Sequence, residues 1–578
     1  MHGDGAVPGA APTAASAALA EPALPSSSVG LPDPLVGEFE PALRRRDRYF
    51  SHLRVALVSA SDHAWAVTFA LASVVALVGF RGADFPAQDY RVWIFKTHGF
   101  LIWDVNWYGG HADIGYSVLF PIVGAFLGTV PATALACVTS TALFGRLIGR
   151  SSSWACVVAR LWFSIVVVGD LIIGRAPFAC SLACSLAAVY FVRNRQRWPA
   201  VAAATAASLF SPLGAAFLLL IAVGWLPTLG WRRALPFSGA LCGLGVAAVM
   251  GDRGRFPFPW TALSGPLVIV TIGLLLTPRY EHTVRRVLLL YGAACIAVFF
   301  VPNPVGGNMA RLAAIVIGPV AAFVLLRANR MRALLVLVVP LLIFQLQPVV
   351  SAVASAAGDL STKQQYYDGM VRFLGEHQKP VAKVEIPFTR DHWEATYVAE
   401  QVPLARGWDR QVDLSRNAQL YEPLTPQAYE SWLHDNAVTY VALPDAALDA
   451  GGRPEAQILR HPPAWLKQVY TDQHWRIWRV VNATPLATGA AVMTRLTHNG
   501  FTLTATHTGA TLVRLRWSPY WHVDSGLACV AQAAGGWTTV VTGAPGEVKI
   551  SAAISIGSDD TCTPAQLTGA GVAPAGSG

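Results

Sequence analysis

Charged side chains are scarce in this sequence. Asp, Glu, Lys and Arg together make up 13% of the 578 residues, whereas soluble proteins carry about 25%. Hydrophobic residues make up 53%, and such a composition is typical of a chain that crosses a membrane several times. The formal net charge of +9 does not indicate nucleic-acid binding, because most Lys and Arg residues lie in short loops between apolar runs. We also find no nucleic-acid-binding motif.

Lys and Arg are absent from the first 40 positions, which are rich in Ala, Pro, Ser and Gly. A signal peptide needs a basic start and an apolar core, so this segment does not fit one. We interpret residues 1–60 as a disordered cytoplasmic tail that ends in a basic juxtamembrane segment. Arginines at positions 44–46, 48 and 54 precede the first apolar run, which places the N-terminus in the cytoplasm by the positive-inside rule.

Residues 61–352 contain about eleven apolar runs that we expect to span the membrane. The runs cover 63–80, 116–148 (a half-inserted helix followed by a span), 154–173, 178–192, 200–210, 213–227, 234–250, 263–276, 287–301, 312–326 and 334–350. Arginine clusters recur in every second connection, which supports this register. The odd number of spans puts the chain after about residue 351 on the outer side of the plasma membrane.

The polar C-terminal region divides into two folded parts. In residues 353–483 helical and strand patterns alternate, which indicates a small α/β domain. Residues 484–560 alternate between apolar and polar positions and carry the hairpin signal Asn499-Gly500, so we expect a β-sandwich-like module. The Gly/Ala/Pro-rich tail, 561–578, is expected to be disordered.

Cysteine is rare in the polar C-terminal region. Only Cys529 and Cys562, of eight cysteines, lie there, and they are a plausible disulfide if the region is outside the cytoplasm. The other six lie in apolar runs, where a small buried hydrophobe is the simpler interpretation.

The connection between the first two runs, residues 81–120, is too polar and too aromatic for an ordinary linker. Loops longer than about 15 residues are usually functional or disordered, and this one has too many aromatic residues for disorder. Because Trp and Tyr favour the membrane–water interface, we expect it to lie along the bilayer surface. Its acids and histidines are Asp84, Asp89, Asp104, Asp113, His98 and His111.

Several of these residues have both a chemical and a structural interpretation. Asp84 or Asp89 could be a general base for transfer to a hydroxyl group, or simply a solvated loop acid. His111 follows the Gly109–Gly110 pair and could bind a phosphate or hydroxyl, or fix the turn. Asp104 could cap a surface helix.

Isolated arginines stand at the expected outer ends of spans, at positions 175, 253, 255 and 311. Each could bind a lipid-linked phosphate in a bidentate manner, or reach towards lipid headgroups. Arg311 is the strongest candidate because it follows Asn303 and Asn308 in a Gly/Pro-rich loop. In the C-terminal region, residues 407–413 (GWDRQVD) and the aromatic residues at 517, 520 and 521 could contact a sugar or be buried structural residues.

Four motifs carry a resemblance to a known class. They are GADFPAQ (82–88), WYGGH (107–111), GYSVLFP (115–121) and NPVGGNMARL (303–312). With the many spans and the outer C-terminal region, they resemble the GT-C class of integral-membrane glycosyltransferases. More closely, the chain is similar to polytopic membrane proteins of high-GC Gram-positive bacteria that carry this loop, and to YfhO-like membrane proteins.

The resemblance implies a polytopic α-helical, GT-C-like fold and sugar transfer on the outer face of the membrane, usually with inversion. The donor would be a polyprenyl-phosphate-linked sugar, such as arabinose or mannose, and the acceptor a glycan or lipid of the cell envelope. Asp84, or else Asp89, would be the catalytic base. Donor-phosphate binding falls to Arg311, Arg175 and Asn308, and sugar binding to His111, Trp107, Tyr108 and Gln88. No cofactor and no metal is expected.

Two other functions fit a polytopic chain. A transporter of lipid-linked glycans would usually show internal repeats and charged residues at mid-membrane. We find no convincing repeat, and the acids of interest lie outside the expected spans. A non-catalytic scaffold of envelope assembly remains an alternative.

Overall fold

The computed structural model describes residues 54–149, 151–252, 254–554 and 560–572. The expected N-terminal tail, most of the basic cluster before the first span, and Arg253 lie outside the described residues. The chain divides into one unit of Met1–Ala56 and a second of Leu57–Gly578. Apart from residues 54–56, the elements below belong to the second unit.

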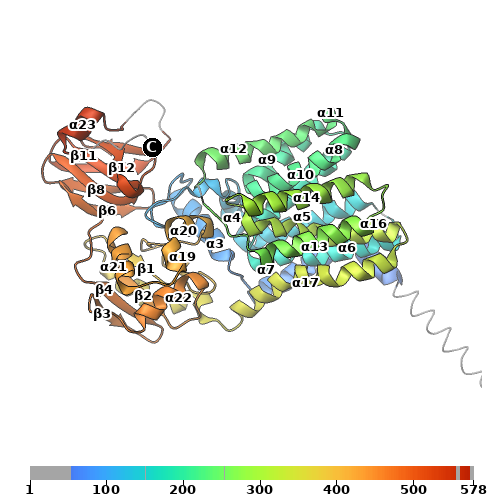
Figure 1. Cartoon of the computed structure of the whole chain (residues 1–578), viewed down its shortest axis with the longest axis horizontal. Helices are drawn as coiled ribbons and strands as arrows, with labels where there is room; N and C mark the ends of the chain where they lie inside the picture. The colour runs from blue at the N-terminus through green and yellow to red at the C-terminus, as the bar shows by residue number, and fades with distance from the viewer. Residues whose placement is uncertain (1–53, 150, 253, 555–559, 573–578) are drawn as a thin grey trace, which may run out of the picture. The chain divides into compact units, whose positions relative to one another are not determined.

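The first half of this unit is a bundle of apolar helices (Figure 1). Among the described residues, eight helices are long and apolar enough to cross a membrane, or nine if the bent pair Arg54–Asp62 and Ala64–Val78 counts as one span. The eight are α5 (Thr129–Ile148), α6 and α7 (Trp154–Val166 and Gly169–Ile173), α8 (Ala176–Arg193), α10 (Pro212–Leu229), α11 to α12 (Trp231–Ala234 and Leu241–Met250), α14 (His282–Phe300), α15 to α16 (Ala310–Leu312 and Gly318–Arg327) and α17 (Met331–Ala356).

The three remaining expected spans are also helices, although shorter ones. They are α2 (Ala64–Val78), α9 (Arg197–Phe210) and α13 (Trp260–Leu276), with 15, 14 and 17 residues. The chain therefore has a membrane-type helical bundle, and a total of eleven spans stays a prediction. The expected break in the second run is the turn at Gly128, where φ is +85° between α4 (Phe120–Leu127) and α5.

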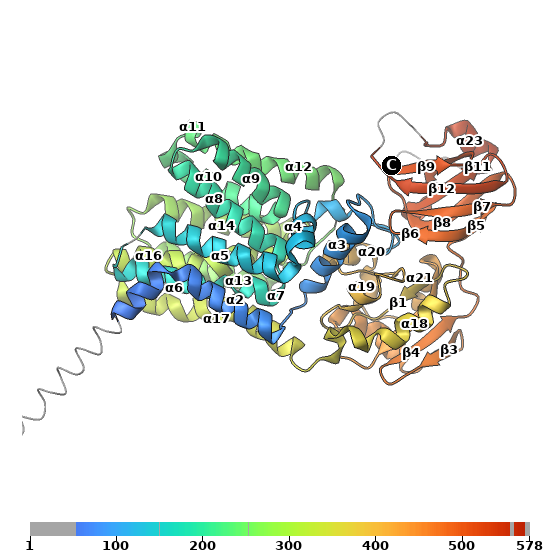
Figure 2. The same cartoon turned by 180° about the vertical axis from the view of Figure 1, so that it is seen from behind.

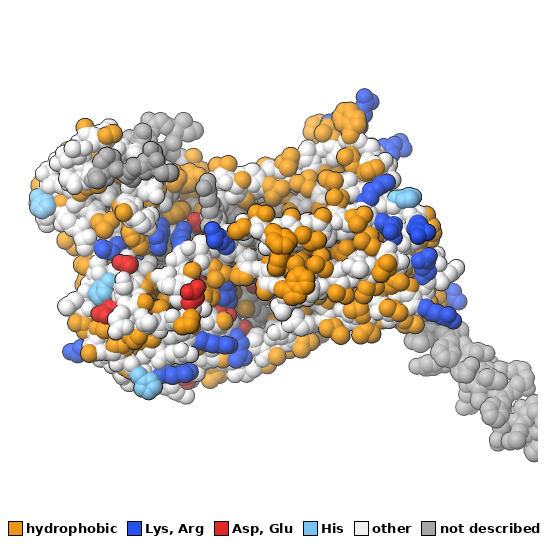
Figure 3. All heavy atoms as spheres, viewed as in Figure 1, with side chains coloured by type: hydrophobic (Ala, Val, Ile, Leu, Met, Phe, Trp, Pro, Cys, Tyr) orange, Lys and Arg blue, Asp and Glu red, His pale blue; other side chains and the backbone are white. Residues whose placement is uncertain are grey.

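Small residues let the helices pack closely, as is usual in membrane bundles. The hydroxyl of Ser181 in α8 donates to the carbonyl of Ala207 in α9, and a Cβ on Gly214 would lie only 2.0 Å from Ser181 Oγ. Hydrophobic side chains cover the outside of the bundle in Figure 3, and Lys and Arg side chains gather at its end away from the C-terminal sheets. This distribution fits a membrane environment along the sides of the bundle.

The expected α/β domain follows α17. Its sheet has the strand order β1-β2-β4-β3, with β1 parallel to β2 and the other pairs antiparallel. The strands are β1 (Lys383–Glu385), β2 (Val438–Pro444), β3 (Leu466–Thr471) and β4 (Trp475–Val480). Its helices are α18 (Asp368–Glu376), α19 (Glu394–Tyr397), α20 (Arg410–Arg416), α21 (Pro426–Asp435) and α22 (Arg453–Leu459).

The last part of the chain has two four-stranded antiparallel sheets around one hydrophobic core, ordered β10-β11-β8-β5 and β6-β7-β12-β9. The strands are β5 (Ala487–Gly489), β6 (Ala491–Thr497), β7 (Gly500–Ala505), β8 (Gly509–Arg516), β9 (Trp521–Ser525), β10 (Ala528–Gln532), β11 (Trp537–Thr542) and β12 (Gly546–Ala552). Cys529 and Cys562 form a disulfide.

The prediction that the chain is disordered from residue 561 onwards is wrong for the first part of that tail. Helix α23 (Pro564–Gly569) forms there, and its start is a capping box in which Thr563 and Gln566 each bond the other's backbone N–H. The disulfide at Cys562 holds this helix against β10.

Residues 81–120 pack against the C-terminal parts of the chain, and their placement along the bilayer surface stays a prediction. The segment, with helix α3 (Phe85–His98), lies against both C-terminal parts in the two views of Figures 1 and 2. Trp107 is fully buried in the core of the α/β domain, and Trp103 is buried in the core of the sandwich. Trp107 Nε1 donates to the carbonyl of Ala395 at 3.0 Å. The rings of Trp103 and Trp107 thus pack against parts of the protein that come much later in the sequence.

Candidate functional site

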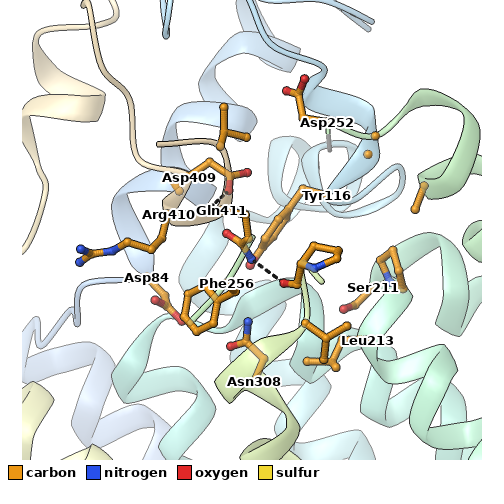
Figure 4. Close-up of a pocket in the computed structure, with 18 of the residues that line it drawn as sticks. Asp84, Tyr116, Ser211, Leu213, Asp252, Phe256, Asn308, Asp409, Arg410 and Gln411 are labelled. Atoms are coloured by element: carbon orange, nitrogen blue, oxygen red, sulfur yellow. Dashed lines mark hydrogen bonds between the residues drawn. The ribbon is translucent and has the colours of Figure 1, made fainter. Parts of the chain in front are cut away.

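A cavity of about 420 Å³ lies where the 81–120 segment, the helix ends and the α/β domain meet (Figure 4). The segment contributes Asp84, Gln88, Arg91 and Tyr116; the bundle contributes Arg175, Asp252, Asn308 and Arg311; and the α/β domain contributes residues 408–412. Apolar side chains such as Ile173, Leu213 and Val305 complete the wall. The cavity therefore joins an apolar surface to a strongly polar one.

Close backbone contact fixes Asp84 at the edge of this cavity. Gly82 N donates to Ile172 O at 2.9 Å, and Asp84 N donates to Ile173 O at 3.2 Å. Gly174 has φ of +93°, and a Cβ there would lie 2.5 Å from Phe85 N. Glycine at this position thus lets the start of α3 lie directly against the end of α7.

Two arginines approach the carboxylate of Asp84. Arg311 Nη2 lies 3.4 Å from Oδ2, and Arg175 Nε lies 3.7 Å from the same oxygen. The side chain of Asp84 is 31% exposed, whereas those of Arg175 and Arg311 are 17% and 12% exposed. Burial, and after it the charge of Arg311, lowers the pKa of Arg175. This part of the cavity thus has two crowded cations and one open carboxylate.

Asp170 extends the charged cluster into a membrane-type helix. It is buried in α7, and its Oδ1 lies 4.0 Å from Arg175 Nη1. Asp170 is thus an acid within an expected span, whereas the acids considered for catalysis lie outside the spans. Asp170 stands in the last turns of Trp154–Ile173, at the cavity end of the helix, and not at its middle.

The α/β domain closes the opposite side through residues 408–412, which we call the rim. Trp408 Nε1 donates to Ala83 O at 2.6 Å, next to Asp84. Gln411 O accepts from Arg255 N at 3.2 Å, and Gln411 Nε2 donates to Pro304 O at 3.4 Å. The rim is thereby bonded to three separate connections of the bundle, so the domain is an integral part of the site.

Three carboxylates line the cavity, and two of them, Asp409 and Asp252, accept hydrogen bonds from backbone N–H groups. Asp409 accepts from Gln411 N as the cap of α20 and lies 3.7 Å from Arg91 Nη2; burial raises its pKa, and Arg91 opposes this. Asp252 accepts from Ala112 N at 2.9 Å and pairs with Arg416 at 3.1 Å. Asp84 does not cap α3 through its side chain. Of the three, Asp84 is thus the carboxylate that is not used to hold the backbone.

Gln88, predicted to bind substrate, and Asn308, predicted to bind the donor phosphate, both line the cavity. The side chain of Gln88 is 1% exposed, and its Oε1 has no hydrogen-bond partner among the described residues. A buried carbonyl oxygen without a partner is costly, so a ligand hydroxyl that donates to it would be favoured.

Asp89 lies outside the cavity lining. It pairs with Arg81 at 3.7 Å. Burial raises its pKa, with a hydrogen bond from Thr129 and the charge of Arg81 acting in the opposite direction. The structure thus brings Asp84, and not Asp89, to the two arginines.

The cavity lining does not include Trp107, Tyr108 or His111, which pack behind the residues that form it. Tyr108 Oη donates to the carbonyl of Gly407 and lies 3.0 Å from Asp409 O. His111 is buried, stacks on Trp107 at 5.2 Å and lies 3.2 Å from Asp104 O through Nδ1. The prediction that these three residues contact the sugar directly is therefore wrong, because their rings are enclosed in packed cores.

Sequence reasoning missed Arg91, Tyr116 and Asp252 as cavity residues. One signal could have found Arg91: positions 84, 88 and 91 have the spacing that places side chains on one helical face. Arg255, by contrast, contributes its backbone to the rim and lies outside the lining.

Within the described parts of the chain, no group of three or more His, Cys, Asp or Glu residues could hold a metal ion. The chain matches no model of a known protein family, and no curated protein matches it.

Proposed function

We propose that the protein is a membrane glycosyltransferase of the GT-C type. It would move a sugar from a polyprenyl-phosphate donor to a glycan or lipid acceptor of the cell envelope, on the outer face of the plasma membrane. One observation carries the proposal: an open carboxylate, Asp84, lies beside two arginines in a cavity bounded by apolar helix ends and a polar domain.

The donor has two chemically different ends, and so does the cavity. A phosphate is well matched by guanidinium groups, which donate parallel hydrogen bonds to its oxygens. Arg175 and Arg311 supply these groups at the ends of membrane-type helices. The isoprenoid chain would continue along apolar wall residues such as Ile173 and Leu213 towards the lipid.

The sugar would lie between the phosphate site and the rim. There the buried oxygen of Gln88 lacks a donor, and Asp409 and Gln411 add polar atoms to the wall. Trp408 lines the same region and offers an aromatic surface. Hydroxyl groups and the apolar face of a sugar ring suit such a lining.

The reaction would be a direct displacement. The acceptor hydroxyl attacks the anomeric carbon and gives its proton to Asp84, while the bond from that carbon to the phosphate oxygen breaks. Polyprenyl phosphate leaves with the bonding electrons, and its growing negative charge is stabilised by Arg175 and Arg311. A single displacement inverts the configuration at the anomeric carbon.

The test is transfer of radiolabelled sugar from polyprenyl-phosphate donors by the purified protein in lipid. We expect turnover by the wild type and loss of at least about 100-fold in Asp84→Asn, because general-base catalysis contributes about 10²–10⁴-fold. Asp89→Asn is the matched control, since it makes the same change outside the cavity, and it should keep activity. Loss in Asp89→Asn alone would move the base.

Absence of turnover with every donor would refute catalysis, provided that the protein is folded and binds polyprenyl phosphate. That outcome would favour a non-catalytic scaffold of envelope assembly. Movement of the intact donor across the bilayer without transfer would instead favour a lipid-linked glycan transporter.

A further inference from the structure

The geometry around Asp84 is unusual for an arginine–carboxylate pair. Such pairs commonly have N–O distances of about 2.7–2.9 Å and use both carboxylate oxygens. Here the ion-pair contacts of Arg311 and Arg175 with Oδ2 are longer, at 3.4 and 3.7 Å. Of these two contacts, only that of Arg311 is also a hydrogen bond. The carboxylate therefore satisfies the two guanidinium groups only in part.

The arginines themselves show the same deficit. Within the described residues, Arg175 Nε and Arg311 Nε are both buried and without a hydrogen-bond partner. Both N–H groups belong to side chains of the cavity lining. The two positive charges also repel each other, and this is one cause of the lowered pKa of Arg175. An anion with more acceptor oxygens than one carboxylate would relieve both problems.

We infer that the Asp84 carboxylate occupies the anion position beside Arg175 and Arg311 when no donor is bound, and that the donor phosphate displaces it from that position. This inference deepens the proposed function and rests on it. The ligand class is a lipid-linked phosphate ester, whose non-bridging oxygens can accept from both guanidinium groups. Once displaced, the carboxylate is released from both cations within the same cavity.

For catalysis, this displacement means that the donor binds before the base becomes active. Before the donor binds, Asp84 is held by Arg175 and Arg311. When the donor phosphate takes over these arginines, the carboxylate becomes available for the acceptor hydroxyl. The two arginines thus would bind the leaving group and switch on the base with one movement.

The inference makes a prediction opposite to that for an ordinary binding residue. Asp84→Asn removes the competing charge, so affinity for undecaprenyl phosphate in mixed micelles should rise by about tenfold, a change of about 1.4 kcal/mol. Arg175→Gln and Arg311→Gln should each lower affinity by tenfold or more. In the double variant Asp84→Asn/Arg311→Gln, the gain from Asp84→Asn should shrink, because one arginine released by it is gone.

Calorimetry with each variant measures these affinities, and a melting curve in the same micelles checks folding. Asp89→Asn controls for the general loss of a negative charge and should leave affinity unchanged. If Asp84→Asn does not fold, Asp84→Ser removes the same charge with a smaller side chain.

Equal or weaker binding by folded Asp84→Asn would overturn the inference, and turnover by the wild type would then still support the proposed function. Saturable binding that tightens in Asp84→Asn, without turnover, would support the anion site and refute the catalysis. No binding by wild type or Asp84→Asn would overturn the phosphate site itself.

Discussion

Lys383 offers a test of how the C-terminal parts are joined. It begins β1, and its side chain is almost fully buried. Nζ donates to Asn436 O at 2.9 Å in the α/β domain and to Arg514 O at 3.1 Å in the sandwich. Burial, and after it the charges of Arg516 and Arg514, lowers the pKa of Lys383 from 10.5 to about 7.

This lowered pKa makes stability depend on pH. Between about pH 7 and 10.5 the unfolded chain holds the proton of Lys383 and the folded chain has lost it, so stability rises with pH in this window. The difference of about 3.5 between the two pKa values, at about 1.4 kcal/mol for each pH unit, corresponds to about 5 kcal/mol. The full cost of burying the amine applies below pH 7 and vanishes above pH 10.5.

Substitution by methionine separates this charge effect from the hydrogen bonds. Lys383→Met leaves two buried carbonyls without their donor, which costs about 1–3 kcal/mol each at every pH. The stability of the wild type relative to Lys383→Met should therefore rise by about 1.4 kcal/mol per pH unit from pH 7 towards 10.5. Denaturant unfolding of the full chain in detergent, between pH 6 and 10, measures this slope.

The control is Lys467→Met, which removes an exposed lysine from β3 of the same domain. It should leave the difference from wild type constant across this pH range. A constant difference for Lys383→Met as well would refute the reasoning, because the buried amine would then carry its proton equally in both states.

Three further substitutions test the packing. Gly174→Ala should lower stability by about 2 kcal/mol more than Gly79→Ala in detergent melting, because both glycines are left-handed helix caps (φ/ψ of +93°/21° and +74°/24°) but only at Gly174 would a Cβ meet backbone, 2.5 Å away. Gly407→Ala places a Cβ 2.3 Å from Trp107 Cγ, so we expect the free energy of unfolding to fall by about 1–3 kcal/mol. We also expect faster proteolysis at the interface of the 81–120 segment with the α/β domain. Cys562→Ser opens a disulfide with a sequence separation of 33 and should cost up to about 4 kcal/mol in oxidising conditions, and nothing relative to wild type after reduction.

Local patterns were enough to predict most elements of this fold. The strand at 438–444 and the turn at Asn499-Gly500 follow from neighbouring residues alone, and the structure has β2 at Val438–Pro444 and a hairpin between β6 and β7. Hydropathy likewise places a helix in every expected run. The tail was missed although its signal is local: Thr563 and Gln566 have the spacing of a capping box, whereas the Gly/Ala/Pro composition around them is typical of disorder.

Only those residues of the candidate site that stand out by their position in the sequence could be predicted. Asp84 and Arg311 follow from their places at the ends of apolar runs, and Arg91 would follow from helical spacing. Asp252 could not be predicted in the same way, because its importance depends on Ala112 and Arg416, which are 140 and 164 residues away. No period or motif in a single sequence records such a contact.

The aromatic residues of the 81–120 segment show why composition alone could not place it. A tryptophan needs apolar contact for its ring and one acceptor for its N–H, and both a membrane interface and a domain interface provide them. What distinguishes the two is a matched surface, and for Trp107 this surface includes Gly407, where a Cβ would lie 2.3 Å from the ring. Because the rim begins at the next residue, the same contact that buries Trp107 also sets Trp408 against Ala83 and closes the cavity over Asp84. The segment and the rim therefore define one site together, and a change in the packing of Trp107 should disturb it without touching any cavity residue.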